Sequence, residues 1–244
     1  MSADKCFAID GLAVPFRDGQ SVLEAALEAG VYIPHLCYKP GFRPHGSCKL
    51  CTVRIGTRHI AACTTVASDA MLVENDTPEI EGMRRTLTEM LFVEGNHTCP
   101  ACEKSGDCRL QAVGYHVGMV SPRFAHFYPA RDLDASHPDV LLDRNRCILC
   151  ELCVQASREI DGKSVFAIGG RGIGARLIVD APSGRLGDTT LAVEDAAVAV
   201  CPVGAILVKR RAYEVPVGSR TYDGRSIAEV AVAEARDVRK RGHV

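Results

Sequence analysis

Eleven of the twelve cysteines in this 244-residue chain fall into three groups along the sequence. The first group, spaced C-x10-C-x2-C-x11-C, consists of Cys37, Cys48, Cys51 and Cys63. The second consists of Cys99, Cys102 and Cys108, with His97 two residues ahead, and the third of Cys147, Cys150, Cys153 and Cys201. Cysteine thiolates are the usual ligands of iron–sulfur clusters. Three such groups in one chain therefore predict electron transfer rather than acid–base catalysis.

The third group has the most characteristic spacing. Three cysteines two residues apart can place their sulfurs around one point in a tight turn, and a distant fourth joins that turn to the rest of the fold. Pro202 follows Cys201, as in bacterial ferredoxin-type sequences. Arg144 and Arg146 precede the triplet and would offset part of the negative charge of a [4Fe–4S] cluster; the alternative is that either is simply solvated.

The first group differs from the plant ferredoxin spacing because ten residues separate Cys37 from Cys48. Its C-x2-C pair, with one cysteine on either side, still suits a [2Fe–2S] cluster. Gly46 and Ser47 could present backbone N–H groups to the sulfurs, which would tune the reduction potential. The alternative is a structural zinc site in a binding or structural protein, although zinc ribbons usually combine two C-x2-C pairs and this group has one.

The second group has only three cysteines, whereas a [4Fe–4S] cluster takes four ligands. His97 is the nearest candidate for the fourth. Residues two apart in extended backbone project to the same side, so His97 and Cys99 could reach one cluster. His116 or His126 could instead fold back to the same place.

The composition is that of an ordinary globular protein, with 47% hydrophobic residues, 24% charged residues and a formal net charge of −1. No block of like charges indicates a nucleic-acid or membrane-surface partner. No segment approaches the roughly 20 apolar residues that span a bilayer, and the N-terminus lacks a secretory core. We therefore expect a cytoplasmic protein, in which clustered cysteines bind metal rather than form disulfides. Cys6, outside the groups, is expected to pack as a small buried residue.

The first segment, residues 1–76, predicts a compact mixed domain. The expected elements are strands at 5–9 and 12–16 around an Asp10-Gly11 turn, a helix capped by Ser21 and Gly30, and strands at 51–55 and 59–65. Hairpin, helix, cysteine loop and returning strands together indicate a small β-grasp domain of the ferredoxin type.

The second segment, residues 77–120, opens with a helix that starts at Thr77-Pro78-Glu79 and ends at Gly95. Its expected core-facing residues are Ile80, Met83, Leu87, Met90 and Leu91. The second cysteine group follows directly. Residues 121–143 are expected to form an irregular connector over the surface.

The third cluster segment, residues 144–212, predicts short strands at 165–168 and 176–179, a turn at 182–184 and a helix near 193–200. A helical tail, 213–244, contains a capping box formed by Ser226 and Glu229. The whole chain is thus expected to be α+β: a β-grasp [2Fe–2S] domain, a His/Cys-ligated [4Fe–4S] segment and a C-terminal ferredoxin-like [4Fe–4S] domain.

Other catalytic motifs are absent or out of context in the sequence. Gly170-x-Gly172-x-x-Ala175 satisfies a loose dinucleotide fingerprint, but a strand and a turn follow it where a phosphate-binding helix is needed. There is no P-loop, no nucleophile elbow and no H-E-x-x-H zinc motif. We expect no catalytic residue on this chain.

The run GNHTCPACEKSGDCRLQ at 95–111, together with RCILCELC at 146–153 and VCPVGAI at 200–206, resembles a known iron–sulfur module. It is similar to the N-terminal part of the large iron–sulfur subunit of respiratory complex I and of iron-only hydrogenases. It is most similar to the diaphorase small subunit of NAD-reducing nickel–iron hydrogenases. The resemblance covers residues from about 5 to 210.

The resemblance implies one [2Fe–2S] cluster, one [4Fe–4S] cluster held by three cysteines and a histidine, and one all-cysteine [4Fe–4S] cluster. It also implies FMN and NAD on a partner diaphorase subunit, and hydrogenase small and large subunits as further partners. The larger relatives place the histidine four residues before the first cysteine, where this chain has Gly95. The ligand role of His97 is therefore inferred rather than matched.

The expected function is a relay of single electrons between a flavin/NAD subunit and a nickel–iron hydrogenase module. The same module could serve an NAD-dependent formate dehydrogenase or another flavin-linked complex. Neither the choice between NAD and NADP nor the direction of electron flow can be read from the residues.

Overall fold

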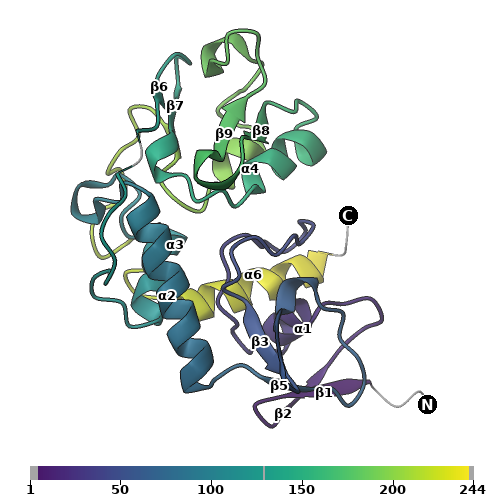
Figure 1. Ribbon diagram of the computed structural model, residues 1–244. Helices are drawn as coiled ribbons and strands as arrows, with labels where there is room; N and C mark the ends of the chain where they lie inside the picture. The colour runs from purple at the N-terminus through teal and green to yellow at the C-terminus, as the bar shows by residue number, and fades with distance from the viewer. Residues whose placement is uncertain (1–4, 129, 242–244) are drawn as a thin grey trace. The chain divides into compact units, whose positions relative to one another are not determined.

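The computed structural model describes residues 5–128 and 130–241, which combine helices and sheets as expected (Figure 1). The chain divides into two compact units. Unit 1 consists of Met1–Thr88, Val113–Val120 and Arg225–Val244, of which residues 1–4 and 242–244 fall outside the description. Unit 2 consists of Glu89–Ala112 and Ser121–Gly224. The first cysteine group therefore belongs to unit 1, and the other two belong to unit 2.

Unit 1 is built on a five-stranded sheet with the order β2-β1-β5-β3-β4. Its strands are β1 (Cys6–Ile9), β2 (Leu12–Pro15), β3 (Thr52–Ile55), β4 (Arg58–Ala61) and β5 (Leu72–Glu74). The predicted hairpin is confirmed: β1 and β2 are antiparallel, and Asp10 and Gly11 turn with positive φ of 49° and 83°. β1 pairs in parallel with β5, which brings residues far apart in the sequence into the centre of the sheet.

Helix α1 (Val22–Ala29) has the ends that the sequence predicts. Glu24 N donates to Ser21 Oγ at 3.2 Å, and Ser21 N donates to the Glu24 carboxylate at 2.9 Å, completing a capping box. Gly30 ends the helix in the left-handed conformation, with φ of 96°. Helix α6 (Ile227–Arg241) packs against α1 and contributes Ala231 to the same core.

Two expectations in unit 1 were wrong. The strand predicted at 59–65 ends at Ala61, and a single 3-10 turn at Ala62–Thr64 follows, which turns Cys63 inward. Cys6 is exposed rather than packed, because Phe7 and Ile9 take the core face of β1 and the alternation of a strand places Cys6 on the other face.

Helix α2 (Pro78–Glu94) begins as predicted, with Ile80 N donating to Thr77 Oγ1 at 3.3 Å, but its buried face differs. Met90 is 44% exposed. The buried residues of the helix are Ile80, Arg84, Thr88, Glu89, Phe92 and Val93. The prediction misplaced the buried face because it followed hydrophobic residues alone, whereas Arg84, Thr88 and Glu89 are polar and buried.

Unit 2 has two small sheets. β10 (Ile206–Val208), β7 (Val140–Asp143) and β6 (Leu133–Asp134) form one, and β8 (Phe166–Gly169) pairs with β9 (Arg176–Val179) in the other. The expectation of an irregular connector at 121–143 was therefore wrong. β7 pairs with β10, more than sixty residues further along, and no local pattern shows such a pairing.

The helices of unit 2 are short. α4 covers Leu152–Gln155, and α5 covers only Ala196–Ala199 of the helix predicted near 193–200. α3 (Arg109–His116) follows Cys108 and runs from unit 2 into unit 1. The loop at Gly172–Gly174 is a 3-10 turn that leads into β9, as expected for glycines with no phosphate-binding role. No helix within the described ranges combines the length and the apolar character that crossing a membrane requires.

Candidate metal centres

The first cysteine group lies at the edge of the unit 1 core. Cys37 comes from the loop after α1, Cys48 and Cys51 from the turn before β3, and Cys63 from the 3-10 turn after β4. Three of the four side chains are 1% exposed, and Cys48 is half-buried. Separate backbone segments thus deliver four sulfurs to one place.

The sulfurs of the first group interact with one another. The hydrogen bond from the Cys48 thiol lowers the pKa of Cys37 to about 5, and the same contact raises the pKa of Cys48. The Cys48 N–H donates to Cys37 Sγ at 3.5 Å, and the Ser47 side chain also contacts that sulfur. The backbone donor is therefore Cys48 rather than the predicted Gly46 or Ser47. Such donors stabilise negative charge on sulfur, as a [2Fe–2S] cluster requires.

Arg84 on α2 holds the turn that carries Cys51. Its guanidinium, in a residue 5% exposed, donates to Leu50 O at 3.1 Å, to Thr52 O at 3.0 Å and to Asn75 O at 2.9 Å. Burial lowers the pKa of Arg84 to about 10, so it is still a cation at neutral pH. The carbonyls on either side of Cys51 are thereby fixed by one buried charge.

The second group lines a small cavity in unit 2. Its lining includes His97, Cys99, Cys102 and Cys108 together with Phe92. The cysteines come from the 3-10 turn Cys99–Ala101, the residue after it, and the residue before α3. Neither His116 nor His126 is part of the lining: the His116 ring packs against Tyr32, and the His126 ring stacks on Tyr128.

His97 lines this cavity, and its imidazole is neutral at neutral pH. Its Nε2 is buried and has no hydrogen-bond partner among the described residues, which is costly for a polar atom unless something binds it. Burial, with a contribution from Arg146, lowers the pKa of His97 to about 4, so the imidazole keeps its lone pair at neutral pH. An orphaned buried nitrogen beside three sulfurs fits the ligand set of a cluster.

Gly95 makes room for this imidazole. A Cβ built on Gly95 would lie 2.4 Å from His97 Nε2 and 3.0 Å from Asn145 O. The His97 ring therefore occupies the space into which a side chain at position 95 would project. The position of the His97 ring therefore depends on the absence of a side chain at residue 95.

The third group lines a second small cavity in unit 2. All four cysteines contribute to it, and the remaining walls are largely apolar. Burial raises the pKa of Cys147 to about 11 and also raises that of Cys153. Without a bound cation these thiols keep their protons, so metal binding must displace them.

Strained backbone shapes the turn that carries the triplet. Leu149 and Glu151 both have left-handed φ, of 53° and 60°, although neither is glycine. Leu149 N donates to Cys147 Sγ at 3.5 Å. Left-handed residues in a tight turn direct successive N–H groups inward and form concavities that bind anions, iron–sulfur clusters among them.

The two arginines ahead of the triplet have separate partners. Arg144 Nε donates to Leu177 O at 2.9 Å, and its charge acts on Cys147 against the effect of burial. Arg146 instead places Nη1 3.6 Å from Cys102 Sγ, so it contacts the second group and not the third. The sequence associated Arg146 with the third group, whereas the sulfur that it contacts belongs to the second.

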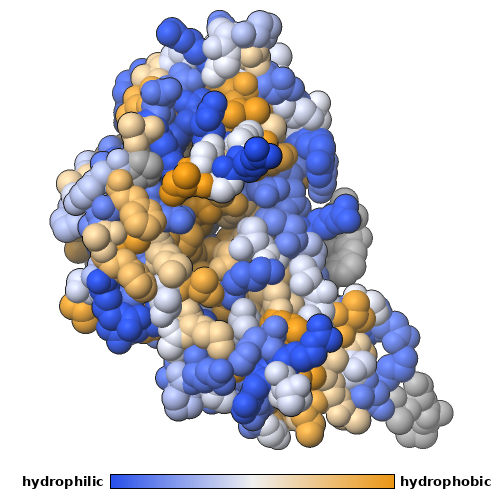
Figure 2. Space-filling model, in the orientation of Figure 1, coloured by the Kyte–Doolittle hydropathy of each residue, from blue (hydrophilic) through white to orange (hydrophobic). Residues whose placement is uncertain are grey.

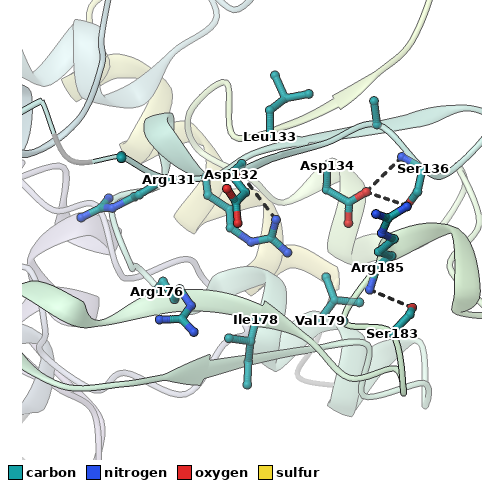
Figure 3. A pocket seen from close by; sticks show the side chains of 14 residues that line it. Arg131, Asp132, Leu133, Asp134, Ser136, Arg176, Ile178, Val179, Ser183 and Arg185 are labelled. Atoms are coloured by element: carbon teal, nitrogen blue, oxygen red, sulfur yellow. Dashed lines mark hydrogen bonds between the residues drawn. The ribbon is translucent and has the colours of Figure 1, made fainter.

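A cavity of about 770 Å³ in unit 2 has no cysteine in its lining (Figure 3). Its lining includes four arginines: Arg131, Arg144, Arg176 and Arg185. Alternation along β9 separates it from the third group, since Arg176 and Ile178 line this cavity and Leu177 lines the cysteine cavity. Sequence reasoning missed this arginine-lined cavity because its walls come from distant segments.

Comparison with known families matches each cysteine group in turn. Residues 6–78 match a family described as a 2Fe-2S iron-sulfur cluster binding domain. Residues 84–123 match the NADH-ubiquinone oxidoreductase-G iron-sulfur binding region, and residues 140–208 match a 4Fe-4S single cluster domain.

Among individual proteins, the chain is 42% identical over 220 residues to the gamma subunit of the NAD-reducing hydrogenase HoxS of Cupriavidus necator, covering 90% of this chain and 93% of that one. It is 32% identical over 216 residues to the mitochondrial NADH-ubiquinone oxidoreductase 78 kDa subunit of Candida albicans, covering 84% of this chain but 28% of that protein. A crystal structure of an NAD+-reducing [NiFe]-hydrogenase in the H2-reduced state contains a chain that is 51% identical, with a TM-score of 0.92 over 96% of this chain and 99% of that one.

Proposed function

The chain belongs to the family of the gamma subunit of NAD-reducing hydrogenase, and from this premise we propose that it relays single electrons between a flavin- and NAD-binding subunit and a nickel–iron hydrogenase module. It is an iron–sulfur subunit of an oxidoreductase complex. The observation that carries the proposal is the gathering of twelve donor side chains into three separate sites. No catalytic residue is assigned to this chain, which works inside a cytoplasmic complex.

The first site is proposed to hold a [2Fe–2S] cluster in a β-grasp domain. The sheet order β2-β1-β5-β3-β4, with β1 and β5 parallel and α1 packed in the same core, supports that fold. The four sulfurs already lie within hydrogen-bonding range of one another in pairs, Cys37 with Cys48 and Cys51 with Cys63. We propose residues 1–76 as this module.

The other two sites are proposed to hold one [4Fe–4S] cluster each. His97, Cys99, Cys102 and Cys108 would ligate the second cluster in the module 77–120, and Cys147, Cys150, Cys153 and Cys201 would ligate the third in the module 144–212. Residues 121–143 lie between these modules in the sequence and contribute β6 and β7 to the sheet that includes β10, and the tail 213–244 carries α6. The orphaned Nε2 of His97 supports its place in the ligand set.

Bound clusters would supply one-electron chemistry, which matches a flavin that divides a two-electron hydride step into single electrons. The chain's residues position the sulfurs and exclude water. Apolar side chains such as Ile168, Leu177 and Val203 wall the third site. Low polarity around a cluster, together with N–H donors to its sulfurs, sets its reduction potential.

Assembly with partner subunits is supported by apolar side chains on the surface. Phe127 and Tyr128 in unit 2 are 58% and 70% exposed. On the face shown in Figure 2, hydrophobic patches lie among hydrophilic ones. Exposed aromatic residues are common at protein–protein interfaces, so these residues are candidate contacts with the flavin subunit or the hydrogenase subunits.

The test is anaerobic purification of the native complex, with assays for iron, acid-labile sulfide, nickel and flavin. We expect about ten iron atoms on this chain, from one [2Fe–2S] and two [4Fe–4S] clusters. Nickel and flavin should co-purify, whereas the isolated chain should not reduce NAD with hydrogen. Zinc in place of iron, or hydrogen-dependent NAD reduction by the single chain, would overturn the proposal.

A further inference from the structure

The guanidinium of Arg146 lies at the cavity of the second group, although its backbone adjoins the third group. Its Nη1 is 3.6 Å from Cys102 Sγ and 2.5 Å from a Glu103 carboxylate oxygen, and its Nε is 2.9 Å from Asp143. The side chain is 21% exposed. The backbone of Arg146 continues directly into Cys147, the first cysteine of the third group. One residue therefore contacts a sulfur of one site and adjoins a sulfur of the next.

Gly204 leaves the space that this guanidinium occupies. It lies three residues after Cys201, the last cysteine of the third group. A Cβ on Gly204 would be 3.2 Å from Cys102 Sγ and 3.3 Å from Arg146 Nη1, closer than side chains normally pack. A Cβ at this position would require Cys102 Sγ, the guanidinium or both to shift by a few tenths of an ångström.

Two backbone hydrogen bonds join the same two sites. The N–H of Asn96, one residue before the histidine of the second group, donates to Asn145 O at 2.8 Å. On the other flank, the N–H of Arg109 donates to Pro202 O at 2.9 Å. Segments on both sides of the second group are therefore joined to segments of the third, which holds the backbone of Arg146 next to the second group.

A cation that donates a hydrogen bond to a ligating sulfur stabilises the more negative, reduced form of a cluster. The effect is strong where water is excluded, since charges interact more strongly at low local dielectric constant. Glu103 and Asp143 fix the direction of the guanidinium and partly offset its charge. If the ion pairs of Arg146 only stabilised the fold, its guanidinium would not need to lie within reach of Cys102 Sγ.

We propose that Arg146 is a positioning residue that raises the reduction potential of the second cluster through its hydrogen bond to Cys102. This inference rests on the proposed function, because it requires a cluster at the second site. Reduction of the second cluster takes up one electron, and no bond is formed or broken at Arg146. The third cluster, whose sulfurs Arg146 does not contact, is affected less.

The test is a redox titration of the purified complex, followed by the EPR signals of the individual clusters. Arg146→Gln should move the midpoint of the second cluster to more negative potential, with a smaller change at the third. Arg146→Lys, which keeps the charge, should shift it less. Arg144→Gln is the matched control, because Arg144 donates to Leu177 O and to no sulfur of the second group.

Gly204→Ala provides an independent variant in which the arginine is retained. Its Cβ should push the guanidinium away from Cys102 and shift the same midpoint in the same direction. In complexes with selectively ¹⁵N-labelled arginine, the nitrogen coupling to the second cluster should be present in the wild type and weakened in Gly204→Ala.

Unchanged midpoints in both Arg146→Gln and Gly204→Ala, with full iron content, would overturn the inference and leave the relay intact. A wild-type complex with no [4Fe–4S] signal from the second site would overturn the proposed function, and this inference with it. The iron content and the second-cluster signal therefore test the proposed function, and the midpoint potential of the second cluster tests the role of Arg146.

Discussion

Unit 1 and unit 2 position their sulfurs by different means. In unit 1 a five-stranded sheet and two helices form a continuous core, and the first cysteine group lies at its edge. In unit 2 the described strands form two separate small sheets, and the cysteines of the second and third groups line two small cavities. We therefore expect the first site to keep its shape without a bound cluster better than the other two sites do.

One arginine in each unit shows the same contrast. Arg84 in unit 1 donates to backbone carbonyls around Cys51, so it fixes the course of the chain. Arg146 in unit 2 reaches a ligand sulfur directly. An arginine thus stabilises the backbone around a cysteine in unit 1 and negative charge on a sulfur in unit 2. We therefore expect a change of Arg84 to lower stability first, and a change of Arg146 to shift a reduction potential first.

Removal of iron should produce the largest difference between the two units. Chelation under anaerobic, reducing conditions should leave β1–β5 protected while β6–β10 lose protection. A five-stranded sheet with its own core holds unit 1, whereas residues of β8, β9 and β10 line the third site, which loses its metal. We expect amide exchange in unit 2 to accelerate on the order of 100-fold. Hydrogen exchange with mass spectrometry measures both units in one sample. Equal acceleration in both units would show that unit 1 has no independent stability.

Gly95→Ala should disturb the second site specifically. The new Cβ would lie 2.4 Å from His97 Nε2, so the imidazole must leave its place beside the sulfurs. We expect the EPR signal of the second cluster to change or disappear as it does in His97→Ala, while the other two clusters keep theirs. Gly82→Ala, within α2, is the matched control, since its Cβ meets nothing within 4 Å.

The control itself should slightly stabilise α2, by up to about 1 kcal/mol, because alanine favours a helix interior over glycine. A second-cluster signal unaffected by Gly95→Ala would contradict the assignment of His97. The double variant Gly95→His with His97→Ala sharpens the test. Partial return of the signal would show that an imidazole from position 95 reaches the same cluster.

Local sequence patterns were sufficient for the features that local chemistry determines. The Asp10-Gly11 turn and the caps at Ser21 and Gly30 are specified within a few residues, and all were predicted. The gathering of His97 with Cys99 also follows from close spacing. These features need no knowledge of distant segments.

The features that were missed depend on tertiary partners. β7 exists because β10 pairs with it, and the buried face of α2 includes Arg84 because carbonyls of another segment accept its hydrogen bonds. Arg146 precedes Cys147 in the sequence, yet its side chain serves Cys102. Spacing identified the candidate ligands, but not the groups that surround them.

Arg84→Met should lower the free energy of unfolding of unit 1 by about 3 kcal/mol, because several buried carbonyls lose their donor. The change is best measured by hydrogen exchange of the β3 and β5 amides in the full complex. Arg58→Met, at an exposed position of β4 with no ion pair among the described residues, should change it by less than about 0.5 kcal/mol. Similar effects for the two variants would show that Arg84 does not fix the turn around Cys51.

The smallest expected effect is a difference in stability cost between two capping boxes within unit 1. Ser21 caps α1 at a position 6% exposed, and Ser226 caps α6 at an exposed position, each with a glutamate three residues later. Ser21→Ala should cost about 1 kcal/mol and Ser226→Ala about 0.5 kcal/mol, because water can replace the lost acceptor only at the exposed cap. Amide exchange in the first turn of each helix measures both. A larger loss at Ser226 would mean that α6, rather than α1, limits the stability of the core that carries the first site.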